Sequence, residues 1–418
     1  MKAYIYTLIA LFSLSVSLAA QDFCEISYGN GYVNQVYYTL NGDQSTVIDP
    51  LDWDIAFTTI GQQDAGIHIN EANSNSGSDL ELYLAPSNDF SANIDPNSLG
   101  DPVYNDEKSW EFGAFNNTRD PSNPFDYGWG TYNPMLQTVE ATTGYVIKRR
   151  DGAYVKMEVC TLAGTVYTVR WANLDGSNEE TFTIDKADYP DSPLAYYSLA
   201  DGEFKAIPNQ WDLLFTRYRT PLDAGGGMTI QYLLTGTFSG HGVEVAEADN
   251  VNPSNVDHED YADQYSSELD VLGWDWKDFT GMGWAIPDDR AYFVKTATGE
   301  IWKIIFDDFE GSTTGVTVFI KELVDQISSI DDPVVISEVS LSPNPATTES
   351  YLSYSTVEGA EVQWRLINNL GAVVASNVQY RQAGFHVETL NLEDLPRGAY
   401  FLELQTAGDL VTQKLQRF

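Results

Sequence analysis

Hydrophobic and polar residues alternate with a period of two at several places along the chain. In the segments WDIAFT (53–58) and WDLLFT (211–216), large apolar side chains occupy every second position, and the residues between them are mostly polar or small. This period places successive side chains on opposite faces of a β-strand. We therefore predict two half-buried strands; in the first, Trp53, Ile55 and Phe57 face the core and the intervening residues lie on the other face.

The chain carries a degenerate duplication. The segment 36–59 resembles 195–217, and each contains a paired tyrosine, a turn with Gly and Asp, and then the tryptophan-led strand. Farther along, 144–159 resembles 291–306, and each has a glycine between two β-rich runs, which is typical of a tight hairpin turn. Because the order of these elements is the same in both halves, we predict two copies of one antiparallel β domain.

The two ends of the chain differ from the repeated part. A basic start, an uncharged apolar run and small residues at 17–20 predict a cleaved secretory signal. A polar segment separates the second copy from short alternating strands, which predict a small β-sandwich. The predicted fold is all-β, with one short helix at 258–265. The predicted parts are a signal peptide (1–20), copy 1 (21–188), copy 2 (189–326), a linker (327–337) and a C-terminal domain (338–418).

The charge of the chain limits its partners. It has 61 Asp and Glu residues against 22 Lys and Arg, for a net charge of −39. Such a surface repels phosphate groups, which excludes nucleic acid and disfavours anionic lipid. After the signal segment no run of about 18 apolar residues occurs, so no transmembrane segment is predicted. The acidic clusters 257–260 and 307–310 lack the spacing of a calcium loop; we interpret them as solvated surface, with cation binding as the alternative.

Two features bear on chemistry. The sequence has no HExxH motif, no GxSxG elbow and no phosphate-binding loop, so we predict that the protein is not an enzyme. Cys24 and Cys160 are the only two cysteines. An even count in an exported chain permits one disulfide, which we predict here, with two unpaired thiols as the alternative.

The C-terminal domain carries a specific resemblance. The segments SPNPA (342–346), LINNLGAVV (366–374), LNLEDLPRGAYFLEL (390–404) and KLQRF (414–418) resemble the type A sorting domain of the type IX secretion system of Bacteroidetes. The resemblance implies that the type IX machinery recognises 338–418, passes the protein across the outer membrane, and leaves it extracellular or attached to the outer cell surface.

The duplicated part is similar to a second family. DWDIAFTT (52–59), QWDLLFTRY (210–218) and GVEVAEAD (242–249) resemble the HmuY-like haem-binding family of surface and secreted β proteins. This resemblance implies two HmuY-like domains and haem as a ligand. Known members hold the iron with histidine or methionine, but the resemblance does not place those ligands on particular residues of this chain.

Haem requires soft nitrogen or sulfur ligands in an apolar slot. The chain has four histidines. His241 and His258 lie in the second copy, whereas we expect His68 to be a solvent-facing strand residue. Met228 and Met282 are softer candidates. The alternatives are a solvated histidine and a methionine that only fills the core.

Three tryptophans at 274, 276 and 284 stand close together in GWDWKDFTGMGW. They would form a stacking platform for sugar rings or a flat macrocycle if exposed, and core if buried. Two hypotheses for the function follow. The chain is a secreted or cell-surface protein that binds haem, or it is a structural or adhesive protein that contacts glycans or cells without a cofactor.

Overall fold

The structure is a computed structural model that describes residues 22–418 except 62–63, 76, 327–335, 358, 369–370 and 407–409. The predicted signal peptide and most of the predicted linker lie outside the described residues. Antiparallel strands dominate the rest, so the prediction of an all-β fold is confirmed. The short 3-10 helices are Pro96–Ser98 (η1), Ala114–Asn116 (η2), Lys186–Asp188 (η3), His258–Tyr261 (η4) and Gly311–Thr313 (η5). In the described part, no helix is long and apolar enough to cross a membrane.

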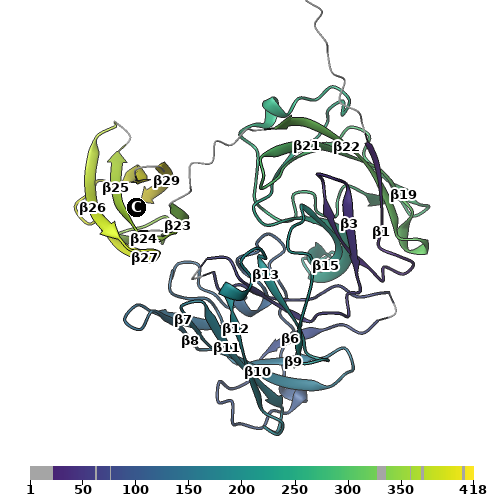
Figure 1. Ribbon diagram of the computed structural model, residues 1–418, viewed down its shortest axis with the longest axis horizontal. Helices are drawn as coiled ribbons and strands as arrows, with labels where there is room; N and C mark the ends of the chain where they lie inside the picture. Colours follow the sequence, from purple (N-terminus) through teal and green to yellow (C-terminus); the bar gives the residue numbers. More distant parts are fainter. Residues whose placement is uncertain are drawn as a thin grey trace, which may run out of the picture.

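A first sandwich is built from residues 55–205 (Figure 1). One sheet has the order β14-β13-β4-β5, and the other has the order β12-β11-β10-β8-β7. In the second sheet, β9 pairs with both β10 and β6. The sheets enclose one core, in which the rings of Phe57 and Tyr167 lie 5.5 Å apart. The strands are β4 (Ile55–Thr58), β5 (Ile67–Ile69), β6 (Glu81–Leu84), β7 (Gly130–Asn133), β8 (Thr138–Ala141), β9 (Tyr145–Lys148), β10 (Tyr154–Ala163), β11 (Val166–Asn173), β12 (Glu180–Asp185), β13 (Leu194–Ser198) and β14 (Glu203–Lys205).

A second sandwich joins the start of the chain to residues 213–326. Its sheets have the orders β1-β22-β21-β20-β17 and β16-β15-β2-β3. Between them, Phe215 stacks on Phe319 with 5.7 Å between ring centroids. The strands are β1 (Asp22–Ser27), β2 (Gln35–Thr39), β3 (Gln44–Ile48), β15 (Leu213–Asp223), β16 (Thr229–Ser239), β17 (Glu244–Ala248), β20 (Ala291–Lys295), β21 (Glu300–Phe309) and β22 (Val316–Gln326), with the separate hairpin β18 (Asp278–Phe279) and β19 (Trp284–Ala285).

The two repeated segments exchange partners between the sandwiches. Strand β2 pairs with β15, so that Tyr38 lies opposite Leu213. Strand β13 pairs with β4, and the equivalent residues Tyr197 and Ile55 lie opposite each other. Each copy therefore gives its paired-tyrosine strand to the tryptophan-led strand of the other copy. One compact unit is 55–205, and the other is 22–48 together with 213–326. These units do not coincide with the two sequence copies, 21–188 and 189–326.

The aspartate that follows each tryptophan fixes this exchange. Asp54 accepts a hydrogen bond from the Leu199 N–H at 2.7 Å, and Asp212 accepts one from the Leu40 N–H at the same distance. Each aspartate N–H also donates to the carbonyl of the second tyrosine of the exchanged strand, at 2.9 Å. The same three-residue geometry thus occurs twice, and it ties the end of each exchanged strand to its acceptor.

The outer faces of the two acceptor strands meet at a junction between the sandwiches. Ala56 and Leu214 are buried there, and Trp110 packs against both of their clusters. The rings of Trp53 and Tyr196 lie 4.9 Å apart, in an edge-to-face contact. The predicted half-buried strand at 53–58 is therefore wrong in one respect. Both of its faces are covered, and Trp53 packs into the junction instead of sharing the core of Ile55 and Phe57 because it precedes β4.

Local predictions of turns are confirmed. Gly152 and Gly299 have φ of 84° and 87° and connect β9 to β10 and β20 to β21. The helix expected at 258–265 is only the 3-10 helix η4, where the Glu259 N–H donates to the Asp257 side chain at 3.1 Å.

The C-terminal domain forms its own core between two sheets, β23-β24-β27 and β26-β25-β28-β29. It contacts the first sandwich through the Phe125 and Tyr351 rings, 5.7 Å apart, and a 2.9 Å hydrogen bond from the Ser342 hydroxyl to the Pro121 carbonyl. The strands are β23 (Ile336–Ser342), β24 (Glu349–Thr356), β25 (Ala360–Asn368), β26 (Val373–Arg381), β27 (Gly384–Asn391), β28 (Gly398–Gln405) and β29 (Leu410–Arg417).

Candidate functional site

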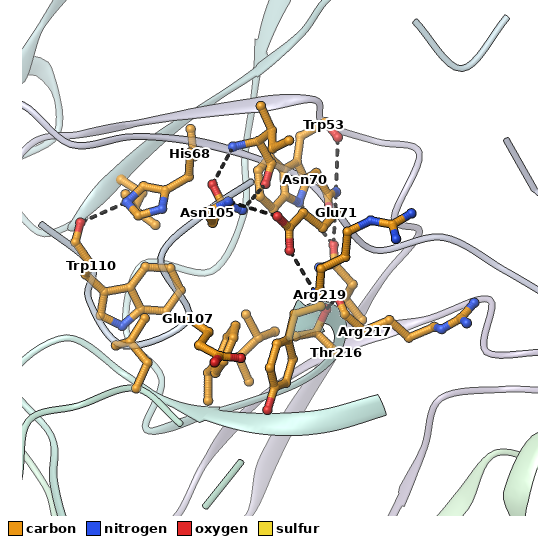
Figure 2. Close-up of a pocket in the computed structure, with 18 of the residues that line it drawn as sticks. Trp53, His68, Asn70, Glu71, Asn105, Glu107, Trp110, Thr216, Arg217 and Arg219 are labelled. Atoms are coloured by element: carbon orange, nitrogen blue, oxygen red, sulfur yellow. Dashed lines mark hydrogen bonds between the residues drawn. The ribbon is translucent and has the colours of Figure 1, made fainter. Parts of the chain in front are cut away.

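A cavity lies at the junction, between the end of β5, the loop at 105–110 and β15 (Figure 2). Its volume is about 50 Å³. One water molecule needs about 10–15 Å³ on this measure, so the cavity has room for roughly three to five waters. Sites for cofactor-sized ligands occupy about 300 Å³ or more. The junction cavity therefore suits ordered water and excludes haem.

Glu71 bridges the two sandwiches at this cavity. Its carboxylate accepts one hydrogen bond from the Asn105 N–H and another from the Arg219 N–H, each at 2.9 Å. Asn105 precedes η2 of the first sandwich, whereas Arg219 is on β15 of the second. Burial raises the pKa of Glu71 to about 7, although both backbone donors oppose the shift. The carboxyl therefore titrates near neutral pH where the two sandwiches meet.

His68 faces this junction and not solvent, which corrects the sequence-based expectation. The residue is 4% exposed because both faces of the β5 sheet are covered. Its Nε2 lies 2.8 Å from the Trp110 carbonyl oxygen, so Nε2 carries the proton and donates (Figure 2). Burial lowers the pKa of His68 to about 4, which keeps the ring neutral at physiological pH. Its role in this arrangement is to join the loop at 105–110 to β5.

Metal binding finds no geometric support in the part of the chain that the structure describes. No group of three or more His, Cys, Asp or Glu side chains is placed to hold an ion there. This holds for the acidic clusters 257–260 and 307–310, which the sequence left open as cation sites.

A second, larger groove has a volume of about 840 Å³ and is lined by both sandwiches. His241, in the turn before β17, is on its wall. The imidazole is exposed, but the surrounding protein removes part of its hydration and lowers its pKa. The apolar lining of the groove includes the accessible Ile60, Tyr189, Pro190, Pro193 and Ala297 and the buried Trp211 and Val243, and its charged lining is Lys186, Asp191, Asp212 and Glu300. A neutral imidazole beside an apolar surface is thus available to a ligand.

The other three predicted haem ligands are elsewhere. His258 lies in η4, where its Nε2 is 3.8 Å from an Asp325 carboxylate oxygen. Met228 is 65% exposed in the turn between β15 and β16, and Met282 is fully exposed between β18 and β19. None of the three is among the described residues that line the groove of His241. The structure therefore does not bring the four candidates together.

The predicted disulfide between Cys24 and Cys160 is not formed in the structure. Cys24 is on β1 of the second sandwich, where its sulfur accepts a hydrogen bond from the Tyr38 hydroxyl at 3.2 Å. Cys160 is on β10 of the first sandwich, next to the Glu158 carbonyl. The exchange of strands explains the difference, because it moves β1 into the second sandwich and away from β10.

The motifs of the C-terminal domain converge on its last strand. The Asn344 side chain donates to the Lys414 carbonyl at 2.6 Å and accepts from the Gln416 N–H at 2.9 Å. The Arg417 guanidinium donates to the Leu392 carbonyl at 2.7 Å. SPNPA, LNLED and KLQRF, which are far apart in sequence, thus form one hydrogen-bonded structure around β29. Lys414 is exposed on it, whereas Arg417 is partly buried.

Comparison with known families identifies this domain. Residues 340–416 match the secretion system C-terminal sorting domain. The predicted type IX sorting domain is therefore supported, and it indicates export to the cell surface or the medium. The HmuY-like resemblance of the duplicated part is not shown by the comparisons and stays a prediction.

Other comparisons add little. A search of curated proteins finds no match to the chain. Among solved structures, dimeric latent PorU from Porphyromonas gingivalis is similar at 11% identity with a TM-score of 0.19. That match covers 83% of this chain and 34% of the other, so this chain spans about a third of that protein's length. At this TM-score the likeness carries no argument about fold or function.

Proposed function

We propose that this exported protein is a non-enzymatic binding protein that takes a flat, largely apolar ligand, with haem as the first candidate, in the groove beside His241. The single observation that carries the proposal is the position of His241 on the wall of that groove. A volume of about 840 Å³ is in the range of small-molecule sites, which occupy about 300–1,000 Å³.

His241 is the groove residue that would hold the iron of a haem. Only the neutral imidazole coordinates iron, and the lowered pKa of His241 keeps the ring neutral to a lower pH than an ordinary histidine. Ile60, Tyr189, Pro190 and Pro193, which are partly or fully exposed, add apolar surface on the same groove. His258, Met228 and Met282 have no part in this site.

A haemin titration of the mature protein, followed by absorbance, tests the proposal. We expect a Soret band distinct from that of free haemin, and affinity that falls as acid protonates His241. His241→Ala should weaken binding by about tenfold or more, which corresponds to about 1.4 kcal/mol. His258→Ala is the matched control and should bind as the unmodified protein does. Equal spectra and affinity for His241→Ala and the control would refute haem ligation at this site.

The sorting domain has its own test. We expect that deletion of 338–418 leaves the protein in the periplasm, because the machinery recognises this folded domain. Cell fractionation and blotting measure the distribution. An equal amount of protein outside the cell without the domain would show that export does not depend on it.

A further inference from the structure

The hairpin of β18 and β19 presents aromatic rings to solvent. Phe279 and Trp284 lie directly opposite each other, with 5.3 Å between their ring centroids. Phe279 is 58% exposed and Trp284 is 39% exposed. The tryptophan cluster at 274–284 is therefore divided: Trp276 is core, whereas Trp284 is on the surface.

The core holds the exposed ring of Trp284 in place. Trp284 packs edge-to-face on the buried Phe309 at 4.9 Å, and Phe309 packs on Trp276, which stacks on Phe306 at 4.0 Å. Gly311 lies against the indole, and a Cβ at that position would be 2.6 Å from the indole Nε1. A fixed exposed ring loses little side-chain entropy when a ligand stacks on it.

Exposed polar side chains flank the glycine that lies against the Trp284 indole. The loop that follows Phe309 is EGSTT (310–314), and the side chains of Glu310, Ser312 and Thr313 are exposed. The exposed rings suit the C–H face of a sugar, and polar side chains in the neighbouring segment suit its rim of hydroxyls.

From this arrangement we infer that Phe279 and Trp284 form a stacking platform for a neutral saccharide. Two aromatic side chains bury about 150–250 Å² each, well below the roughly 800 Å² per partner of a stable protein interface. This favours a ligand of one to a few sugar rings over a second copy of the chain. The net charge of −39 disfavours anionic polysaccharides and anionic membranes. The platform is separate from the groove of His241.

Affinity electrophoresis of the mature protein in gels that contain a neutral polysaccharide tests the inference. The probes are dextran, laminarin, mannan and xyloglucan, with alginate as the anionic comparison. We expect retardation by at least one neutral polymer, and a loss of affinity of about tenfold or more for Trp284→Ala. Trp284→Phe, which keeps a ring, should retain part of the binding. Tyr232→Ala removes another aromatic side chain, 53% exposed on β16, and should bind normally.

The outcomes separate the alternatives. Retardation that is lost in Trp284→Ala and kept in Tyr232→Ala supports the platform, provided that both variants unfold at the temperature of the unmodified protein. No retardation by any neutral polymer, equal retardation of Trp284→Ala, or retardation by alginate alone would overturn it. Binding to phosphatidylcholine vesicles that Met282→Ser abolishes would assign the hairpin to lipid instead. Haemin binding should be the same in Trp284→Ala, so failure here leaves the proposed haem site untouched.

Discussion

Removing residues 22–48 should prevent the second sandwich from folding and leave the first one folded. Seven apolar side chains of this segment are buried in the second core: Cys24, Ile26, Tyr28, Tyr32, Val36, Tyr38 and Leu40. Burial of one large apolar side chain contributes about 1.5–3 kcal/mol, so their loss costs roughly 10–20 kcal/mol. That is an upper bound, because unfolded chains bury some apolar surface already. It nevertheless equals or exceeds the net stability of a typical domain, about 5–15 kcal/mol.

Three fragments test this reasoning. Fragment 53–205 contains every strand of the first sandwich and should unfold cooperatively in urea, with a dispersed proton–nitrogen NMR spectrum. Fragment 189–326 corresponds to the second sequence copy but lacks β1, β2 and β3, so it should show neither property. Fragment 206–326 should unfold cooperatively and give a dispersed spectrum when peptide 22–48 is added, because the peptide supplies the missing strands. Cooperative unfolding and a dispersed spectrum for 189–326 alone would refute the exchange of strands.

Two other predictions concern single residues. Because the folded pKa of Glu71 is raised to about 7 from the usual 4.5, its contribution to stability is present below pH 4.5 and is lost as pH rises through 7, by about 3 kcal/mol. Glu71→Gln should remove this dependence. The free energy of unfolding in urea should therefore differ between the variant and the unmodified protein by different amounts at pH 5 and pH 8. The same difference at both pH values would contradict the assignment. A Cβ at Gly113 would be 2.1 Å from the Ile67 carbonyl oxygen, so Gly113→Ala should destabilise by about 1–3 kcal/mol. Gly100→Ala is the control, because no atom outside its chain neighbours lies within 4 Å of a Cβ at that position. Equal urea midpoints of unfolding for the two variants would show that the close contact at Gly113 relaxes without cost.

The sequence predicts strands well here but not their partners. Alternation identified β4 and β15, and glycine placed the hairpin turns. The exchange was invisible because Tyr38 opposite Leu213 is chemically almost the same pair as Tyr38 opposite Ile55. Local preferences therefore do not distinguish pairing within a copy from pairing between copies. The expectation that His68 faces solvent failed for the same reason, since only the junction covers the second face of its sheet.

The sites differ in how far sequence could locate them. The sorting domain was identified because its motifs are short, and each contains residues that bond to another motif. Glu71 carries no such signal: its two donors, Asn105 and Arg219, are 34 and 148 positions away. His241 was named from its place near a family-like segment, but the groove around it is assembled from both sandwiches and has no contiguous pattern.

The exchange of strands also sets an order of folding during transport. A chain that enters the periplasm N-terminus first exposes β1 to β3 long before their partners, since Cys24 pairs opposite Phe319 and Val36 opposite Phe215. The first sandwich is complete once residue 205 has emerged, whereas the second must wait for β22. During that interval the early strands have unpaired edges, which are prone to pair with other chains. The sorting domain follows both sandwiches in the chain, so it becomes available only after both can close, and this order favours delivery of a folded protein to the outer membrane.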